Sequence, residues 1–343
     1  GSETRLQVCT YGATLVSLTV PDREGTPGDV LLGFDDLASY EAHQTYINCA
    51  VGRVCSRIAE ASFRLGDTTY QLPPNNGAAC HHGGPVGFNR YTWDVVESSS
   101  SSVTLRLESP DLDQGFPGKL TVTVQYSLLR VDGGDTAVSV RFHAETDKTT
   151  VVNLTNHVYF NVAGVYNSSG DARSLPEKML DQVVSIAADT FVPTDEVNIP
   201  LGTLRSVDGT PFDFRTPMRV GARIELEDEQ LRIATGYDHN FALREAPSTN
   251  SCGGTRALGV ACDAKGCWAR TRAADAVALD AVSGRSVEVF TEEPAVHFYA
   301  GNYLGNEPPG KGGVAIERRA GLCFETQHFT DSPHRPDWPT LVL

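Results

Sequence analysis

Long uninterrupted runs of apolar residues are missing from this chain of 343 residues. No stretch approaches the roughly 18 consecutive apolar residues that a membrane-spanning helix requires. The first residues also lack the charged-then-apolar pattern of a secretory signal. We therefore expect a soluble protein with a cytoplasmic location and no membrane partner.

The chain also has few positively charged residues. The chain has 28 Lys and Arg against 43 Asp and Glu, which gives a formal net charge of -15. Nucleic acids and anionic membrane surfaces bind clustered Lys and Arg side chains, so this balance argues against both partners. A neutral or cationic small molecule fits the charge better.

Cysteine pairs with the C-x-x-C spacing of a zinc site are absent, although the chain has eight cysteines. A chain of this length can bury a core without disulfides, so we expect reduced thiols. Cys252, Cys262 and Cys267 lie close together in sequence, and with a fourth ligand they could bind zinc. Without a C-x-x-C pair the pattern is weak, and we predict no metal and no cofactor.

What the sequence does contain is a long series of short β-branched and aromatic runs separated by Gly, Pro, Asn and Asp. This rhythm is typical of an antiparallel β protein. So many strands can be accommodated by two large sheets packed face to face, with one concave face left to hold a ligand. We therefore predict an all-β fold, a large antiparallel β-sandwich. The expected strands cover residues 6–20, 61–72, 91–96, 103–108, 120–129, 138–144, 150–160, 182–187, 238–243, 276–279, 286–291, 295–300 and 321–326.

Helical segments are few in this pattern. The best candidates are short helices at 36–41 and 220–224. Residues 245–272 form an excursion that bears cysteines and lacks strand alternation, which predicts a surface loop. Because no boundary interrupts the strand series, we expect a single domain over residues 1–343, with this excursion as an insertion.

The most informative segment runs from residue 153 to residue 161, where polar and β-forming residues alternate. Period-two alternation would place Asn153, Thr155, His157, Tyr159 and Asn161 on one face of a strand. A strand that turns such side chains inward needs a polar cavity. A positioned His is a natural proton donor or acceptor near neutral pH. The alternative is a hydrogen-bonded structural histidine, which the segment alone does not exclude.

A second polar segment, residues 321–327, places Glu325 directly after Leu322, Cys323 and Phe324. A carboxyl group in an apolar strand is desolvated, which would make it a useful base. The alternative is a buried Glu paired structurally with an Arg.

Two more polar segments, 80–84 and 236–241, interrupt apolar surroundings. In the first, His82 is followed by two glycines that would let the backbone approach a ligand closely, although adjacent histidines such as His81 and His82 also occur in loops with no functional role. In the second, Asp238 follows Gly236 and Tyr237, and it could bind a ligand or cap a turn.

Arg53 and Arg57 lie four residues apart in an otherwise apolar segment. A buried guanidinium needs hydrogen-bond acceptors. Both a carboxylate partner and a hydroxyl-rich ligand would supply them, and the residues alone favour the carboxylate.

Taken in order, these segments closely resemble the aldose 1-epimerase (galactose mutarotase) family, and the resemblance covers nearly the whole chain. The matching motifs are Gly52-Arg53 with Arg57-Ile58, His82-Gly83-Gly84, Thr155-Asn156-His157-Val158-Tyr159-Phe160-Asn161, Tyr237-Asp238-His239-Asn240 and Phe324-Glu325-Thr326-Gln327.

The resemblance implies a galactose mutarotase-like β-sandwich that interconverts the α and β anomers of free aldohexoses such as galactose and glucose, without cofactor or metal. It implies that Glu325 is the general base, that His157 is the general acid and that His82 is a second active-site histidine. It also implies that Arg57 and Asp238 hold sugar hydroxyls.

Three positions depart from the pattern of the family. Ser56 stands where Asn is common, His81 where Leu is common, and His297 where a Gln usually contacts the sugar. We expect His297 to bind substrate as well, with altered hydroxyl recognition or pH dependence.

Two other functions stay open at this point. A hexose-6-phosphate 1-epimerase would need additional cationic groups near the cleft to bind the phosphate. A non-catalytic carbohydrate-binding β-sandwich would keep the cleft without the acid and the base.

Overall fold

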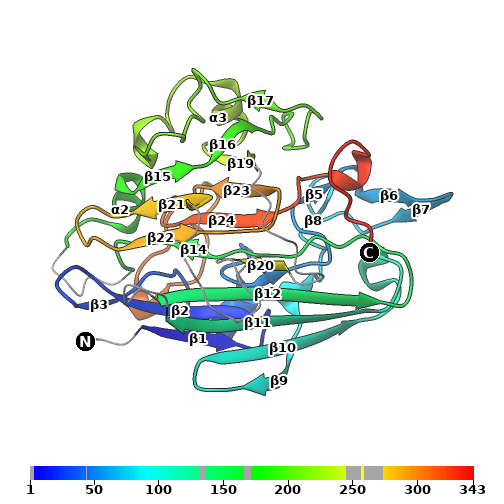
Figure 1. Ribbon diagram of the computed structural model, residues 1–343, viewed down its shortest axis with the longest axis horizontal. Coiled ribbons are helices and arrows are strands. Elements are labelled where there is room, and N and C mark those ends of the chain that lie inside the picture. The colour runs from blue at the N-terminus through cyan, green and yellow to red at the C-terminus, as the bar shows by residue number, and fades with distance from the viewer. Residues whose placement is uncertain (1–3, 44, 131–135, 166–170, 245–255, 259–272) are drawn as a thin grey trace.

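The computed structural model describes residues 4–43, 45–130, 136–165, 171–244, 256–258 and 273–343. Every pairing between named strands is antiparallel in this part of the chain. The strands form large sheets stacked in layers (Figure 1), so the predicted all-β sandwich architecture is confirmed.

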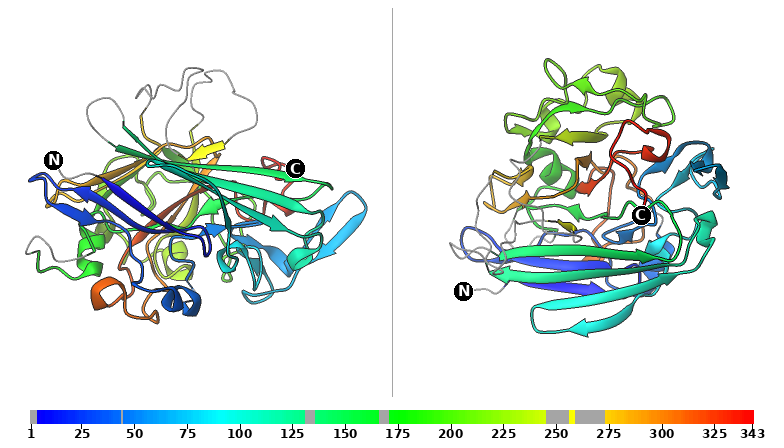
Figure 2. Two further views of the ribbon diagram at one scale, coloured as in Figure 1. Left: turned by 90° about the horizontal axis from the view of Figure 1, so that it is seen from below. Right: turned by 45° about the vertical axis from the view of Figure 1, so that its right-hand side comes forward.

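One layer holds a five-stranded and a three-stranded sheet, seen along the bottom of the right-hand view in Figure 2. The five-stranded sheet has the order β20-β12-β11-β10-β9, and the three-stranded sheet has the order β1-β2-β3. Their bounds are β1 Arg5–Cys9, β2 Thr14–Pro21, β3 Pro27–Asp29, β9 Asp94–Ser98, β10 Ser102–Ser109, β11 Leu120–Arg130, β12 Thr136–Thr146 and β20 Arg256–Leu258.

The other layer is built mainly from the second half of the chain and holds a six-stranded and a four-stranded sheet. Their orders are β14-β24-β23-β19-β16-β17 and β18-β15-β21-β22. The bounds are β14 Tyr159–Phe160, β15 Val183–Ile186, β16 Ala188–Phe191, β17 Arg205–Ser206, β18 Met218–Arg219, β19 Asp238–Leu243, β21 Ala276–Leu279, β22 Ser286–Val289, β23 Ala295–Tyr299 and β24 Leu322–Gln327.

Three short strand pairs complete the sheets. They are β4–β13, β5–β8 and β6–β7. Their bounds are β4 Ala50–Val51, β5 Arg57–Ile58, β6 Ser62–Leu65, β7 Thr68–Gln71, β8 Cys80–His81 and β13 Thr155–Asn156.

The helices of the described residues are short. The helix predicted at 36–41 is confirmed as α1 (Leu37–Ala42), with Asp36 as its N-cap. The predicted 220–224 helix is only one 3₁₀ turn, η4 (Val220–Ala222). The sequence prediction missed α2 (Leu175–Asp181) and α3 (Glu229–Ile233). The other 3₁₀ turns are η1 Ala59–Ala61, η2 Phe88–Arg90, η3 Asp113–Gly115, η5 Lys311–Gly313 and η6 Ser332–His334.

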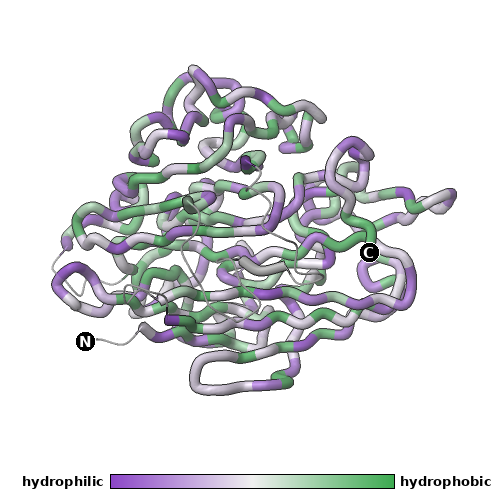
Figure 3. The backbone as a smooth tube through the Cα atoms, in the orientation of Figure 1, coloured by the Kyte–Doolittle hydropathy of each residue, from purple (hydrophilic) through white to green (hydrophobic). Residues whose placement is uncertain are grey.

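Alternation along the strands explains how the layers pack. Along β11, Leu120, Val122, Val124 and Tyr126 are buried while the residues between them are partly exposed, as expected for a sheet with one face on a core. Figure 3 shows apolar and polar residues recurring along these strands. In contrast, every residue of β23 and β24 is buried. Polar side chains on these two central strands therefore lie inside the protein.

No helix among the described residues is long and apolar enough to cross a membrane. The excursion at 245–272 falls mostly outside the described residues, and so do Cys252, Cys262 and Cys267. Its described part forms β20, which adds to the edge of the five-stranded sheet, so the prediction that it carries no strand is wrong there.

Candidate active site

His157 lies between two very short strands rather than within one long strand. β13 pairs with β4, whereas β14 pairs with β24. The prediction of one continuous strand over 150–160 is therefore wrong, because the chain passes from one sheet to the next at His157. The predicted two-faced alternation is nevertheless confirmed. Leu154, Val158 and Phe160 belong to the apolar cluster of the first layer, whereas His157 faces Glu325 of β24.

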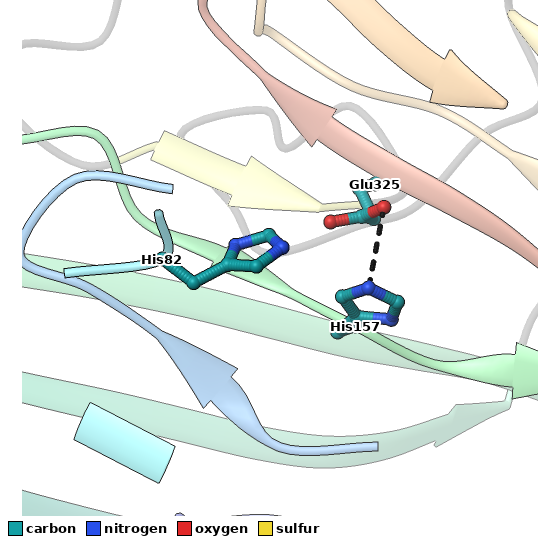
Figure 4. Close-up of side chains that lie close together, drawn as sticks. All are labelled: His82, His157 and Glu325. Carbon is teal, nitrogen blue, oxygen red and sulfur yellow. Dashed lines mark ion pairs between the residues drawn. The ribbon is translucent and has the colours of Figure 1, made fainter. Parts of the chain in front are cut away.

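Glu325 faces His157 from β24. Its Oε1 lies 3.7 Å from His157 Nε2, and both side chains are deeply buried (Figure 4). Its other oxygen, Oε2, is buried without a hydrogen-bond partner in the described part of the chain. The alternative that Glu325 is paired with an arginine is therefore not what the structure shows. A buried carboxylate oxygen without a partner is costly, and such groups cluster at functional sites.

His82 approaches the same pair from the turn after β8, as Figure 4 shows. The turn depends on Gly83, which has φ +86°, and a Cβ there would lie 1.9 Å from the carbonyl oxygen of Gly52. The Ser56 backbone N–H donates to His82 Nδ1 over 3.2 Å. His82 therefore carries its proton on Nε2. Burial, followed by the charges of neighbouring histidines and Arg57, holds the pKa of His82 well below its usual range, so it stays neutral.

The ligating atoms of His82, His157 and Glu325 lie within 4.8 Å of one another, which is close enough to surround one cation. A neutral histidine offers a metal only one lone pair. In His82 that lone pair, on Nδ1, already accepts the N–H of Ser56. The donor set thus fits proton transfer better than metal binding.

Asp238 opens β19, and His297 lies beside it on β23. His297 Nε2 is 2.7 Å from Asp238 Oδ1. Burial alone would raise the pKa of Asp238, but the hydrogen bond from His297, followed by the electrostatic effects of its ring and of Arg57, outweighs burial and lowers the pKa to about 2. Burial lowers the pKa of His297, and Asp238 raises it by more. Asp238 is therefore an ionised acceptor inside the site rather than a turn cap.

Arg57 reaches the site from β5. Its Nε donates to Asn76 Oδ1 over 3.0 Å, and its charge contributes to lowering the pKa of Asp238. Arg53 lies outside the site, where its guanidinium donates to Ser109 Oγ and to backbone carbonyls. The prediction of a carboxylate partner is therefore wrong for both Arg53 and Arg57, because neither forms an ion pair within the described residues.

Comparisons with known proteins identify the family of this chain. A family model described as aldose 1-epimerase matches residues 1–343. The galactose mutarotase of Bos taurus is 37% identical over 339 residues, covering 99% of this chain and 86% of that protein. The chain belongs to the aldose 1-epimerase family. The aldose 1-epimerase of Escherichia coli (strain K12) is 35% identical over 329 residues, covering 96% of this chain and 84% of that protein.

The fold of this chain also matches a solved structure of an aldose epimerase homologue. The crystal structure of the GalM/aldose epimerase homologue from C. elegans has a TM-score of 0.77 and 27% identity to this chain. The match covers 99% of this chain and 91% of that one. The family resemblance and the isomerase class expected from the sequence are thus confirmed.

Sequence reasoning missed residues that contact the proposed acid, His157, and two of them are Tyr46 and Cys323. Tyr46 places its ring 4.5 Å from that of His82 and stacks on His157 at 6.1 Å between centroids. Cys323 Sγ lies 3.5 Å from His157 Nδ1. Cys323 precedes Glu325 by two positions, so period-two alternation places both on the same face of β24 and could have found it.

The departures from the family pattern at Ser56 and His81 both lie beside the site. Ser56 supports His82 through its backbone and accepts Gln327 Nε2 at its hydroxyl over 3.2 Å. His81 is paired with Arg57 across the β5–β8 ladder, and its ring lies 3.7 Å from that of His82. The five cysteines of the described residues, Cys9, Cys49, Cys55, Cys80 and Cys323, are free thiols, in keeping with the prediction of reduced cysteines.

Buried neutral histidines should make the protein sensitive to acid. Burial lowers the pKa of His43 from 6.5 to about 4 and that of His239 from 6.5 to about 3. Because the unfolded chain binds these protons first, the stabilisation is complete above pH 6.5 and is lost as the pH falls toward the folded-state values. We expect the free energy of unfolding in urea to fall below pH 6.5 by up to about 1.4 kcal/mol per pH unit for each histidine.

Two substitutions separate this effect from general acid denaturation. His43→Asn removes the titrating ring but keeps an acceptor for the Thr45 N–H that His43 Nδ1 now accepts. The free energy of unfolding of this variant should fall less steeply below pH 6.5 than that of the wild type. His143→Asn, on a side chain that is 52% exposed, should leave the pH dependence of the free energy of unfolding unchanged. Equal slopes for wild type and His43→Asn would contradict the prediction.

Proposed function

We propose that this protein is a mutarotase that interconverts the α and β anomers of free aldohexoses such as galactose and glucose. The observation that carries the proposal is the Glu325–His157 pair, which is separated by 3.7 Å. The other carboxylate oxygen, Oε2, has no partner in the part of the chain that the structure describes. Opening a pyranose ring requires one proton to leave the anomeric hydroxyl while another reaches the ring oxygen. A base and an acid this close together suit that requirement.

In the proposed cycle, Glu325 takes the proton of the C1 hydroxyl while protonated His157 donates its Nε2 proton to the ring oxygen and becomes neutral. The C1–O5 bond breaks as the C1 oxygen becomes a carbonyl, which yields the open aldehyde. Rotation about C1–C2 then presents the other face of the carbonyl. Reclosure with both proton transfers reversed gives the opposite anomer, and the side chains return to their starting protonation states.

The remaining site residues would hold the sugar. His82 is neutral and carries its proton on Nε2, so it can only donate from that atom toward a sugar oxygen. Asp238 is ionised and accepts hydroxyl protons, and Arg57 donates to hydroxyl oxygens. The proposed chemistry needs no redox cofactor and no phosphate group.

The two other candidate functions have less support. A hexose 6-phosphate would need several cationic groups, and among the proposed site residues only Arg57 has a permanent positive charge. A carbohydrate-binding module without catalysis gives no reason to bury an unpartnered Glu325 oxygen beside a histidine, because that arrangement costs stability.

The partner is thus a small monosaccharide, and a net charge of -15 argues against nucleic acid. Free thiols support a cytoplasmic location, where cysteines stay reduced. We further propose that residues 1–343 act as one domain, with the family match running over this whole range.

Polarimetry of freshly dissolved α-D-galactose and α-D-glucose tests the function directly. We expect the wild-type protein to accelerate the change in optical rotation of both sugars, and α-D-galactose measured without protein serves as the blank. If the protein left the rate unchanged with both sugars, the proposed enzymatic activity would be refuted. A faster rate on glucose 6-phosphate than on glucose would favour the phosphate epimerase instead.

A further inference from the structure

A hydrogen-bonded row of side chains lies behind Asp238. Asn240 on β19 pairs directly with His297 on β23, which pairs in turn with Glu325 on β24. Asn240, His297 and Thr330 are all buried. The orientation of each side chain in this row is fixed by the next one.

The row begins at Thr330. Its backbone N–H and its hydroxyl both donate to Asn240 Oδ1, over 2.9 Å and 2.8 Å. Two donors at one atom identify that atom as the amide oxygen, because the NH₂ group cannot accept. The Asn240 NH₂ group therefore points the other way, to His297 Nδ1 at 3.1 Å.

His297 Nδ1 must then be the acceptor, so the ring carries its proton on Nε2. That nitrogen lies 2.7 Å from Asp238 Oδ1 and donates to it. Both ring nitrogens thus have protein partners, and none is left for a sugar hydroxyl. The substrate contact that the sequence predicted for His297 would have to break one of these bonds.

We propose that His297 is a positioning residue, locked by Thr330 and Asn240 as a neutral Nε2–H donor that holds Asp238 in place to accept a sugar hydroxyl at its other oxygen, Oδ2. No hydrogen bond to Oδ2 occurs within the described residues, so this oxygen is available. The inference rests on the proposed function, since it assigns Asp238 to sugar binding. It explains how a histidine serves where the family usually has Gln, because the Gln amide can donate to a carboxylate too.

The charges around His297 by themselves favour a second proton on the ring, because they raise its pKa in spite of burial. Asp238 on β19 and Glu325 on β24 act to keep a proton on the ring, whereas Arg57 on β5 acts to remove it. His81 and His82, at the end of β8, also interact electrostatically with His297. A second proton would have to enter at Nδ1, where it would meet the Asn240 NH₂ group. The amide orientation therefore decides the protonation state.

Histidine-ring ¹⁵N NMR of the intact protein tests the locked tautomer without any substrate. Assigning His297 by its loss in His297→Gln, we expect a bare Nδ1 and a protonated Nε2 between about pH 6 and about pH 8. In Asn240→Asp a carboxylate oxygen would replace the NH₂ group, and we expect Nδ1 to gain a proton. A protonated Nδ1 in the wild type would overturn the proposal, as would an unchanged ring in Asn240→Asp.

Kinetics test the positioning role. In His297→Leu we expect KM for α-D-galactose to rise by about tenfold or more, with kcat within about threefold, because a hydrogen bond to a charged group is lost away from the reacting atoms. His297→Gln restores a donor and should keep KM within about threefold of wild type. Equal losses in the two variants, or a fall confined to kcat, would overturn the proposal. A wild type without mutarotase activity would refute the proposed function, and the tautomer would still be decided by NMR.

Discussion

Glu325→Gln should lower kcat for mutarotation by about a thousandfold, equivalent to about 4 kcal/mol of transition-state stabilisation. Glutamine has nearly the same shape as glutamate but cannot accept the C1 hydroxyl proton as a base. The wild-type carboxylate is buried beside His157, with one oxygen that has no partner among the described residues. Asp238, the other carboxylate of the proposed site, is held by His297 instead. KM should change much less, because Arg57 and Asp238 would still hold the sugar.

The measurement is the initial rate of polarimetric change over a range of α-D-galactose concentrations. Glu145→Gln is a matched control, since Glu145 lies on β12 in the other layer and is 76% exposed. It should leave both kinetic constants unchanged, and circular dichroism should show that both variants are folded. Full activity of Glu325→Gln would show that the base is a different group, although the family assignment would stand.

His157→Asn is expected to lower kcat by about a hundredfold or more, since general acid catalysis commonly contributes that much. Asparagine removes the proton donor at the ring oxygen while remaining polar. Residual activity should exceed that of Glu325→Gln, because the neutral Nε2–H of His82 stays in the site and can still donate a hydrogen bond.

The double variant His82→Asn/His157→Asn tests this reasoning. If His82 supplies the residual activity, the double variant should fall well below His157→Asn, by about tenfold or more. His143→Asn, on an exposed side chain of β12, controls for the substitution itself. An active His157→Asn variant with unchanged kcat would contradict the assignment of His157 as the acid.

Strand positions were predictable where local alternation was strong. The strands expected at 238–243 and 276–279 match β19 and β21 to the residue. The prediction failed where local signals were weak or conflicting. The capping box of Ser174 and Glu177 was a readable signal for α2, but that helix spans only 7 residues. Short helices are stabilised mainly by tertiary packing, which cannot be read from the sequence.

The sequence by itself determined the β-strand pattern, the ordered motifs that place the chain in the aldose 1-epimerase family, and the candidate site residues. Alternation also determined which face of its segment His157 occupies, because successive side chains in extended backbone point to opposite sides.

Only the tertiary structure decided which groups meet. Periodicity does not reveal which strand pairs with which, so the separation of Glu325 from His157 depends on the pairing of β14 with β24. The tertiary structure also decides which ring nitrogen of each site histidine carries the proton. His82 is fixed by the Ser56 backbone and His297 by Asn240, partners that lie far away in sequence or on another strand. A side chain's chemistry is set by its neighbours in space, and folding alone supplies them.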